Sequence, residues 1–152
     1  MWFSDLPSAR RLHGTVLLVL LLVLCSPVFA QSAPIVVVTA ADGPLTALDR
    51  GTTEQLYLGR RSSLFQGQGV LLVDLPSGPV RDEFYLRLTR KNPSQIRAYW
   101  SRLVFTGRAQ PPREAASTEE ARRIVLQTPG AVAYLPRAEA EDPALRILFS
   151  LD

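Results

Sequence analysis

The chain has 152 residues, of which 47% are hydrophobic and 20% are charged, and its formal net charge is +3. Its only Met, His and Cys (Met1, His13 and Cys25) fall in the first 30 positions, so residues 31–152 contain none of them and carry 15 basic and 13 acidic side chains. This composition excludes from residues 31–152 a thiol nucleophile, a Ser-His-Asp triad, a thiolate or imidazole metal site and a disulfide. We therefore expect one domain that is not an enzyme and holds neither a metal nor a cofactor.

The N-terminal segment has the pattern of a secretory signal. Two arginines precede an apolar run over residues 15–25, and Val28 and Ala30 stand at the −3 and −1 positions of a cleavage site. A small residue at −1 and a small or aliphatic one at −3 are typical of signal peptidase sites. We expect a signal peptide over 1–30, a mature domain over 31–152, and export to the periplasm.

Two other interpretations of this segment stay open. In the first, the segment is kept as a signal anchor, although its apolar run of 11 residues is shorter than the roughly 20 that span a bilayer. In the second, Cys25 is the lipidated residue of a lipoprotein. That cleavage requires a small residue before the cysteine, and here the preceding residue is Leu24.

The mature domain begins with a strand and a short helix. Residues 35–39 form a continuous β-branched run, which predicts a strand buried on both faces. Thr52 and Gln55 have the spacing of a capping box, and Gly59 stands where a helix ends with a left-handed residue. The pattern predicts a helix over 53–58.

A second strand and two helices follow. After a polar loop over 60–69, the apolar run 70–73 predicts another buried strand, and Pro79 is suited to the first position of the next helix. Asn92 precedes a further helix in which apolar residues recur at i, i+3, i+4 and i+7. These residues are Ile96, Tyr99, Trp100 and Leu103. One face of that helix should therefore pack inward.

The last third of the chain returns to strands. Ser117 and Glu120 form a second capping box, which predicts a helix ending at Gln127. Residues 131–135 and 145–149 predict a third and a fourth strand. Strands that alternate with helices indicate an α/β fold with a mostly parallel or mixed sheet flanked by helices.

The turn between the second strand and its helix is the best candidate for a ligand site. Ser77 and Gly78 precede Pro79, so backbone N–H groups and the positive end of a helix dipole are directed at one point. Arg81 adds a guanidinium group suited to phosphate or carboxylate. Because ligands of α/β sheets gather at the carboxyl ends of strands, Thr39 at the end of the first strand is a weaker candidate. The alternative is that Ser77 only caps the helix.

Other candidate groups have plainer explanations. Arg60 and Arg61 could clamp an anion, but they also follow a helix C-terminus, whose dipole they complement. Tyr99 and Trp100 could stack on a base or sugar, but their helical spacing favours core packing. No basic cluster interleaves with aromatic residues, so we expect no nucleic-acid binding. Acidic residues also gather at two places, explained by helix capping and by an acidic loop rather than by catalysis or metal binding. They are Glu119 and Glu120, and Glu139, Glu141 and Asp142.

Several segments together resemble one family, the phosphate-specific substrate-binding proteins of ABC importers. Residues 53–59 resemble the family's helix end, and residues 70–84 resemble its strand, Ser-Gly-Thr turn and following Phe. Residues 105–107 resemble a later glycine-containing loop, and residues 129–134 resemble its Pro-Gly-Ala-Ile-Gly-Tyr strand. The stretch 99–105 is similar to short, exported, single-lobe relatives of these proteins.

This resemblance implies a single lobe of a type 2 periplasmic binding protein. It implies a non-enzymatic protein that binds phosphate or another small oxyanion, or an accessory protein, linked to phosphate uptake or sensing and partnered by a membrane transporter or sensor. The alternative is an envelope protein–protein interaction module that has lost ligand binding. The family's Ser and Gly are kept as Ser77 and Gly78, whereas Asp74 stands where the family has Arg, and Pro79 where it has Thr.

Overall fold

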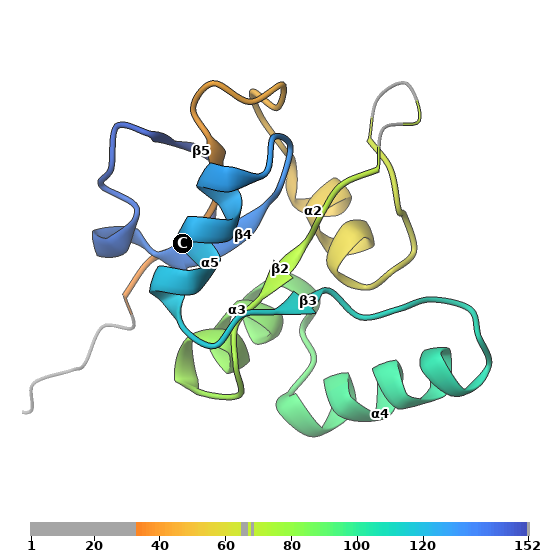
Figure 1. Ribbon diagram of the computed structural model, residues 1–152. Coiled ribbons are helices and arrows are strands. Elements are labelled where there is room, and N and C mark those ends of the chain that lie inside the picture. The colour runs from red at the N-terminus through yellow and green to blue at the C-terminus, as the bar shows by residue number, and fades with distance from the viewer. Residues whose placement is uncertain (1–32, 65–66, 68, 152) are drawn as a thin grey trace, which may run out of the picture. The chain divides into compact units, whose positions relative to one another are not determined.

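Strand β1 (Ile35–Ala40) is buried along its entire length and lies at the centre of a three-stranded antiparallel sheet. Its neighbours are β4 (Ala133–Pro136) and β5 (Leu145–Leu151). In this computed structural model the described residues are 33–64, 67 and 69–151, and the expected signal peptide lies outside them (Figure 1). The strand predicted over 35–39 is confirmed, because a run of β-branched residues fits a position with a strand on each side.

A second, parallel pair extends this sheet. Strand β2 (Val73–Asp74) pairs with β3 (Arg113–Glu114), and a parallel bridge between Leu72 and Val132 links β2 to the start of β4. The strand predicted over 70–73 thus begins later and is shorter. The resulting order is β3-β2-β4-β1-β5, in which β1 runs antiparallel to β4 and therefore also to β2. The sheet is mixed.

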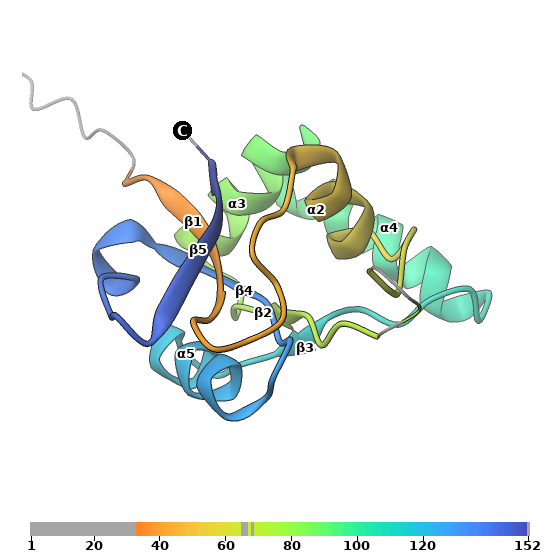
Figure 2. The same cartoon turned by 90° about the horizontal axis from the view of Figure 1, so that it is seen from above.

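Helices flank the sheet on both sides. Figure 2 shows α5 on one side and α2, α3 and α4 on the other. Their bounds are α2 Arg50–Tyr57, α3 Pro79–Thr89, α4 Pro93–Phe105 and α5 Thr118–Gln127, with a 3₁₀ turn, η2, at Arg137–Glu139. This arrangement confirms the α/β fold predicted from the sequence. Among the described residues no helix is both long and apolar enough to cross a membrane.

Local capping signals place most helix starts correctly. Pro79 occupies the first turn of α3, Asn92 forms a full capping box at the start of α4, and Ser117 caps α5. Helix α2 is the exception, because Asp49 rather than Thr52 is its N-cap. The carboxylate of Asp49 accepts hydrogen bonds from both the amide and the hydroxyl of Thr52. The helix therefore begins at Arg50, not at residue 53.

An aromatic cluster fills the space between the sheet and α2 and α3. The rings of Phe84 and Tyr134 stack in parallel with centroids 3.6 Å apart, and Tyr57 meets both rings edge to face. All three side chains are fully buried. Helix α4 packs through Trp100, as its apolar stripe predicted, and is tied to the end of α2 by a bond from the Tyr99 hydroxyl to the Leu58 carbonyl (2.7 Å).

The contact between α2 and α4 requires a residue without a side chain at Gly59. This residue has φ +62°, and a Cβ atom there would lie 2.8 Å from the Trp100 ring. Gly107 has a similar φ of +65° with open space around it. We predict that Gly59→Ala lowers the free energy of unfolding by about 2–4 kcal/mol, from left-handed strain plus overpacking, and Gly107→Ala by about 1 kcal/mol, from strain alone. Urea denaturation of both variants measures the difference, and equal losses would contradict the packing argument.

Candidate functional site

The turn that leads from β2 into α3 contains two of the predicted site residues, Ser77 and Gly78. Gly78 is the N-cap of α3 and no side chain caps the helix. The hydroxyl of Ser77 is exposed and has no hydrogen-bond partner in the described part of the chain. The alternative prediction, in which Ser77 serves as the helix cap, is therefore wrong. The first N–H groups of α3 are therefore left without a side-chain acceptor at this turn.

Arg81 lies on the first turn of α3 and is held by an ion pair. Its Nε donates to Oδ2 of Asp74 over 3.0 Å, and the side chains are only 13% and 5% exposed. The guanidinium also lies over the ring of Tyr85, 5.0 Å from the centroid. Neither Nη group of Arg81 has a partner among the residues that the structure describes. The guanidinium of Arg81 is thus held in position, and its two Nη groups make no hydrogen bond to the described residues.

Asp74 accepts more hydrogen bonds than this one ion pair. Its Oδ2 also accepts from the hydroxyl of Tyr85 (3.1 Å), and its Oδ1 accepts from the hydroxyl of Tyr134 (2.5 Å) and from the amide of Leu75 (2.9 Å). Four donors from β2, α3 and β4 therefore surround one buried carboxylate. These donors, which could otherwise bind an external anion, bind the carboxylate of Asp74 instead.

The tyrosines around Asp74 are held in the protonated form that donates. Burial, reinforced by the charge of Asp74, raises the pKa of Tyr134 far above its ordinary value, and the same two causes raise the pKa of Tyr85. Burial likewise raises the pKa of Tyr57, with a smaller contribution from Tyr85. A phenolate in this cluster would face the carboxylate at close range, which Coulomb repulsion disfavours.

Thr39 lies far from this turn along the direction of the strands. Its side chain is fully buried, and its hydroxyl donates to the carbonyl of Ala131 (2.8 Å). Because β1 runs antiparallel to β2, the carboxyl end of β1 lies beside the amino end of β2, and the two carboxyl ends lie at opposite ends of the strands. The expectation that Thr39 and Ser77 meet at one edge is wrong, since it assumed parallel strands.

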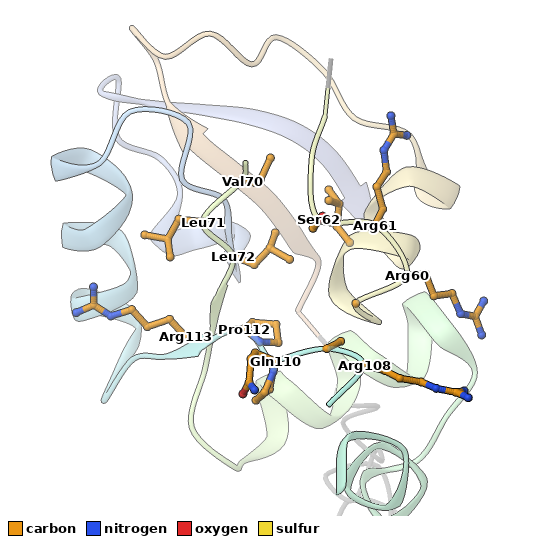
Figure 3. Close-up of a pocket in the computed structure, with 14 residues that line it drawn as sticks. Arg60, Arg61, Ser62, Val70, Leu71, Leu72, Arg108, Gln110, Pro112 and Arg113 are labelled. Carbon is orange, nitrogen blue, oxygen red and sulfur yellow. The ribbon is translucent and has the colours of Figure 1, made fainter. Parts of the chain in front are cut away.

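A groove of about 530 Å³ lies at the amino end of β2, and arginines surround it (Figure 3). It is formed by the end of α2, the start of β2 and the loop between α4 and β3, and no carboxylate of the described residues lines it. The four arginines are Arg60, Arg61, Arg108 and Arg113. Sequence reasoning considered only the first two.

The side chains of these arginines do not converge on one point. In Figure 3, Arg60 and Arg108 extend to the same side, whereas Arg61 and Arg113 point in other directions. The Nε of Arg61 donates to the carbonyl of Ser63 (2.8 Å). The groove therefore has a cationic rim without a single focus for a small anion.

The acidic side chains have local roles. Glu120 accepts from the backbone amide of Ala116 (2.7 Å), and Asp142 pairs with Arg122 (3.3 Å). Within the described ranges no group of three or more His, Cys, Asp or Glu side chains is arranged to hold a metal ion.

Solved structures with a similar fold are known. No protein-family model and no curated protein matches the chain. Among solved structures it is similar to an ABC-type phosphate transport receptor from Vibrio cholerae, with a TM-score of 0.57 and 16% identity over 76% of this chain and 46% of that one. It is also similar to a protein from Clostridium perfringens described as a phosphate ABC transporter substrate-binding protein with bound phosphate, with a TM-score of 0.59 and 14% identity over 76% of this chain and 45% of that one.

These matches identify the fold. The domain has the fold of a substrate-binding protein, and it spans less than half the length of either receptor. The described residues therefore have a fold like one lobe of a periplasmic binding protein, as the sequence resemblance implied. At 14–16% identity the likeness concerns the fold.

The Asp74 cluster makes a prediction about stability. Replacing Asp74 by Asn leaves Arg81 buried beside a neutral amide, so we expect a loss of about 3–5 kcal/mol in the free energy of unfolding. The matched control is Asp142→Asn, where the side chains of the ion pair with Arg122 are 28% and 44% exposed and the loss should stay below about 1 kcal/mol. Chemical denaturation of both variants provides the comparison. Similar small losses would show that Asp74 contributes little to the fold.

The buried tyrosines predict how stability depends on pH. In the unfolded chain they ionise near pH 10, whereas in the folded protein their raised pKa keeps them protonated. The folded state then binds more protons, so stability is constant below about pH 9 and falls above about pH 10, by up to about 1.4 kcal/mol per pH unit for each tyrosine. Urea unfolding at a series of alkaline pH values measures this slope. Tyr134→Phe should reduce it by about a third, and an unchanged slope would contradict the assignment.

Proposed function

We propose that the protein is a non-enzymatic, solute-binding-like component that binds a small oxyanion such as phosphate, weakly, at the turn containing Ser77, Gly78 and Arg81. The observation that carries this proposal is the state of Arg81. The guanidinium is oriented by Asp74 through Nε alone and keeps both Nη groups for a ligand. An oxyanion could pair with that edge in a bidentate manner and accept from the Ser77 hydroxyl and the first amides of α3.

The same geometry limits the affinity. Asp74 cancels the charge of Arg81 at 3.0 Å, and Pro79 contributes no N–H to the turn. A ligand would gain hydrogen bonds but little net Coulomb attraction. We therefore expect dissociation constants between millimolar and micromolar, roughly −4 to −8 kcal/mol.

The setting of this function is also part of the proposal. The N-terminal pattern supports export to the periplasm through a cleaved signal peptide. The structural neighbours are described as an ABC-type phosphate transport receptor and an ABC transporter substrate-binding protein, which supports a role beside a phosphate uptake or sensing system. The transporter or sensor in that system would be the protein partner.

A second candidate function follows from Asp74 itself. Because this carboxylate already accepts from four donors, the lobe is complete without a ligand. In that case the protein is an interaction module whose exposed face docks another envelope protein. The two candidates differ in one measurable property, the response to oxyanions.

Calorimetric titration with phosphate and with sulfate tests the choice. We predict weak phosphate binding that Arg81→Ala abolishes and Ser77→Ala reduces, with Arg137→Ala as the control that leaves it unchanged. Asp74→Asn, studied at a temperature where it is folded, should bind phosphate more tightly because Arg81 keeps its full charge. Asp74→Arg, which restores the family's charge, is a poorer test because it places a second guanidinium among groups that donate. If neither the parent nor Asp74→Asn responds to any oxyanion, the interaction module is the correct function.

A further inference from the structure

Helix α4 presents an unusual exposed face. Phe105, its last residue, is 94% exposed, and Val104 beside it is 43% exposed. With 3.6 residues per turn, Phe105 falls at the middle of the outward face, and the exposed Arg97 and Arg102 flank it on either side. A large apolar ring so fully in water is uncommon unless it serves to contact something else.

The charge on this part of the chain is entirely positive. Residues 90–113 contain six basic side chains and no Asp or Glu. Arg97, Arg102 and Arg108 take part in no ion pair within the described residues, where the pairs belong instead to arginines of α3 and α5. The nearly balanced composition of the whole chain hides this local excess.

The end of α2 lies next to the end of α4. Gly59 contacts Trp100 and Ala109, so Arg60, which follows Gly59, and Arg108, which precedes Ala109, lie near one another in the backbone. Figure 3 shows their side chains extending to the same side. We call Arg60, Arg97, Arg102, Arg108 and Phe105 the α4 surface.

We propose that the α4 surface docks onto an anionic phospholipid membrane, with Phe105 inserted at the boundary between headgroups and acyl chains. Guanidinium groups pair with lipid phosphates in a bidentate manner, and basic residues near a negatively charged bilayer each add to the attraction. The aromatic ring supplies the apolar anchor that interfacial helices use.

The geometry favours a lipid surface over a small ligand. Arg97 and Arg102 lie on a helix about 20 Å long, Phe105 protrudes at its end, and Arg60 and Arg108 lie at the rim of the open groove beside it. A small oxyanion could reach one or two of them and would leave Phe105 in water. This binding is separate from the proposed oxyanion site at Arg81.

Vesicle sedimentation tests the proposal, with the chain starting at Gln31, which contains every buried core residue that the structure describes. We expect binding to phosphatidylcholine vesicles that contain phosphatidylglycerol and none to pure phosphatidylcholine, with loss of binding at high salt. Phe105→Ala should weaken partitioning about tenfold, and the double variant Arg102→Ala/Arg108→Ala about fivefold per arginine. Phe105→Trp should show a blue-shifted emission with the anionic vesicles only.

Matched controls keep the test specific. Leu126→Ala removes an exposed apolar side chain of α5, and Arg137→Ala removes an exposed cation of η2, so both should bind as the parent does. No binding to anionic vesicles at low salt would overturn the proposal and favour an acidic protein as the partner. Binding that Phe105→Ala and the double arginine variant leave unchanged would overturn it as well.

Discussion

The carboxylate of Asp74 joins three elements that are distant in the sequence. It ends β2, accepts from Arg81 and Tyr85 on α3, and accepts from Tyr134 on β4, which is 60 residues further along the chain. Removing a charge from water is expensive, and only several charge-assisted hydrogen bonds offset that penalty. The stacked pair Phe84 and Tyr134 lies in the same cluster, so the position of the core rings depends on this network.

This constraint also determines what the candidate site can do. In a lobe of this fold, the end of a strand and the start of the next helix would ordinarily offer an uncompensated positive end to an anion. Here the positive charge of Arg81 is compensated from within the chain, and burial of both partners strengthens that compensation. Stability and ligand affinity are therefore opposed at Asp74, because any change that frees Arg81 for a ligand also removes an acceptor from the core.

Local signals predicted the parts of the fold that neighbours in the sequence determine. Pro79 and Asn92 mark helix starts because their effects act within one turn, and the strand at residues 35–39 follows from its own side chains. The direction of β1 relative to β2 depends on pairing with β4, almost 100 residues later, and no local pattern encodes it. This is why Thr39 was grouped with Ser77. The partner of Arg81 is equally hard to predict from the sequence, since the pairing of Asp74 with the guanidinium requires the folded turn.

Charge distribution, not total charge, decides where an anionic partner can approach. The domain carries nearly equal numbers of basic and acidic residues, yet residues 90–113 contain six basic side chains and no acidic one. At Arg81 the opposite charges are 3.0 Å apart, and their fields cancel for any solute beyond a few ångströms. Along α4 the arginines have no such partners, and their field extends into solvent for about the Debye length of 8 Å at physiological salt. A small oxyanion must therefore find hydrogen-bond geometry at the turn, whereas an extended anionic surface is attracted first by charge and then held by Phe105.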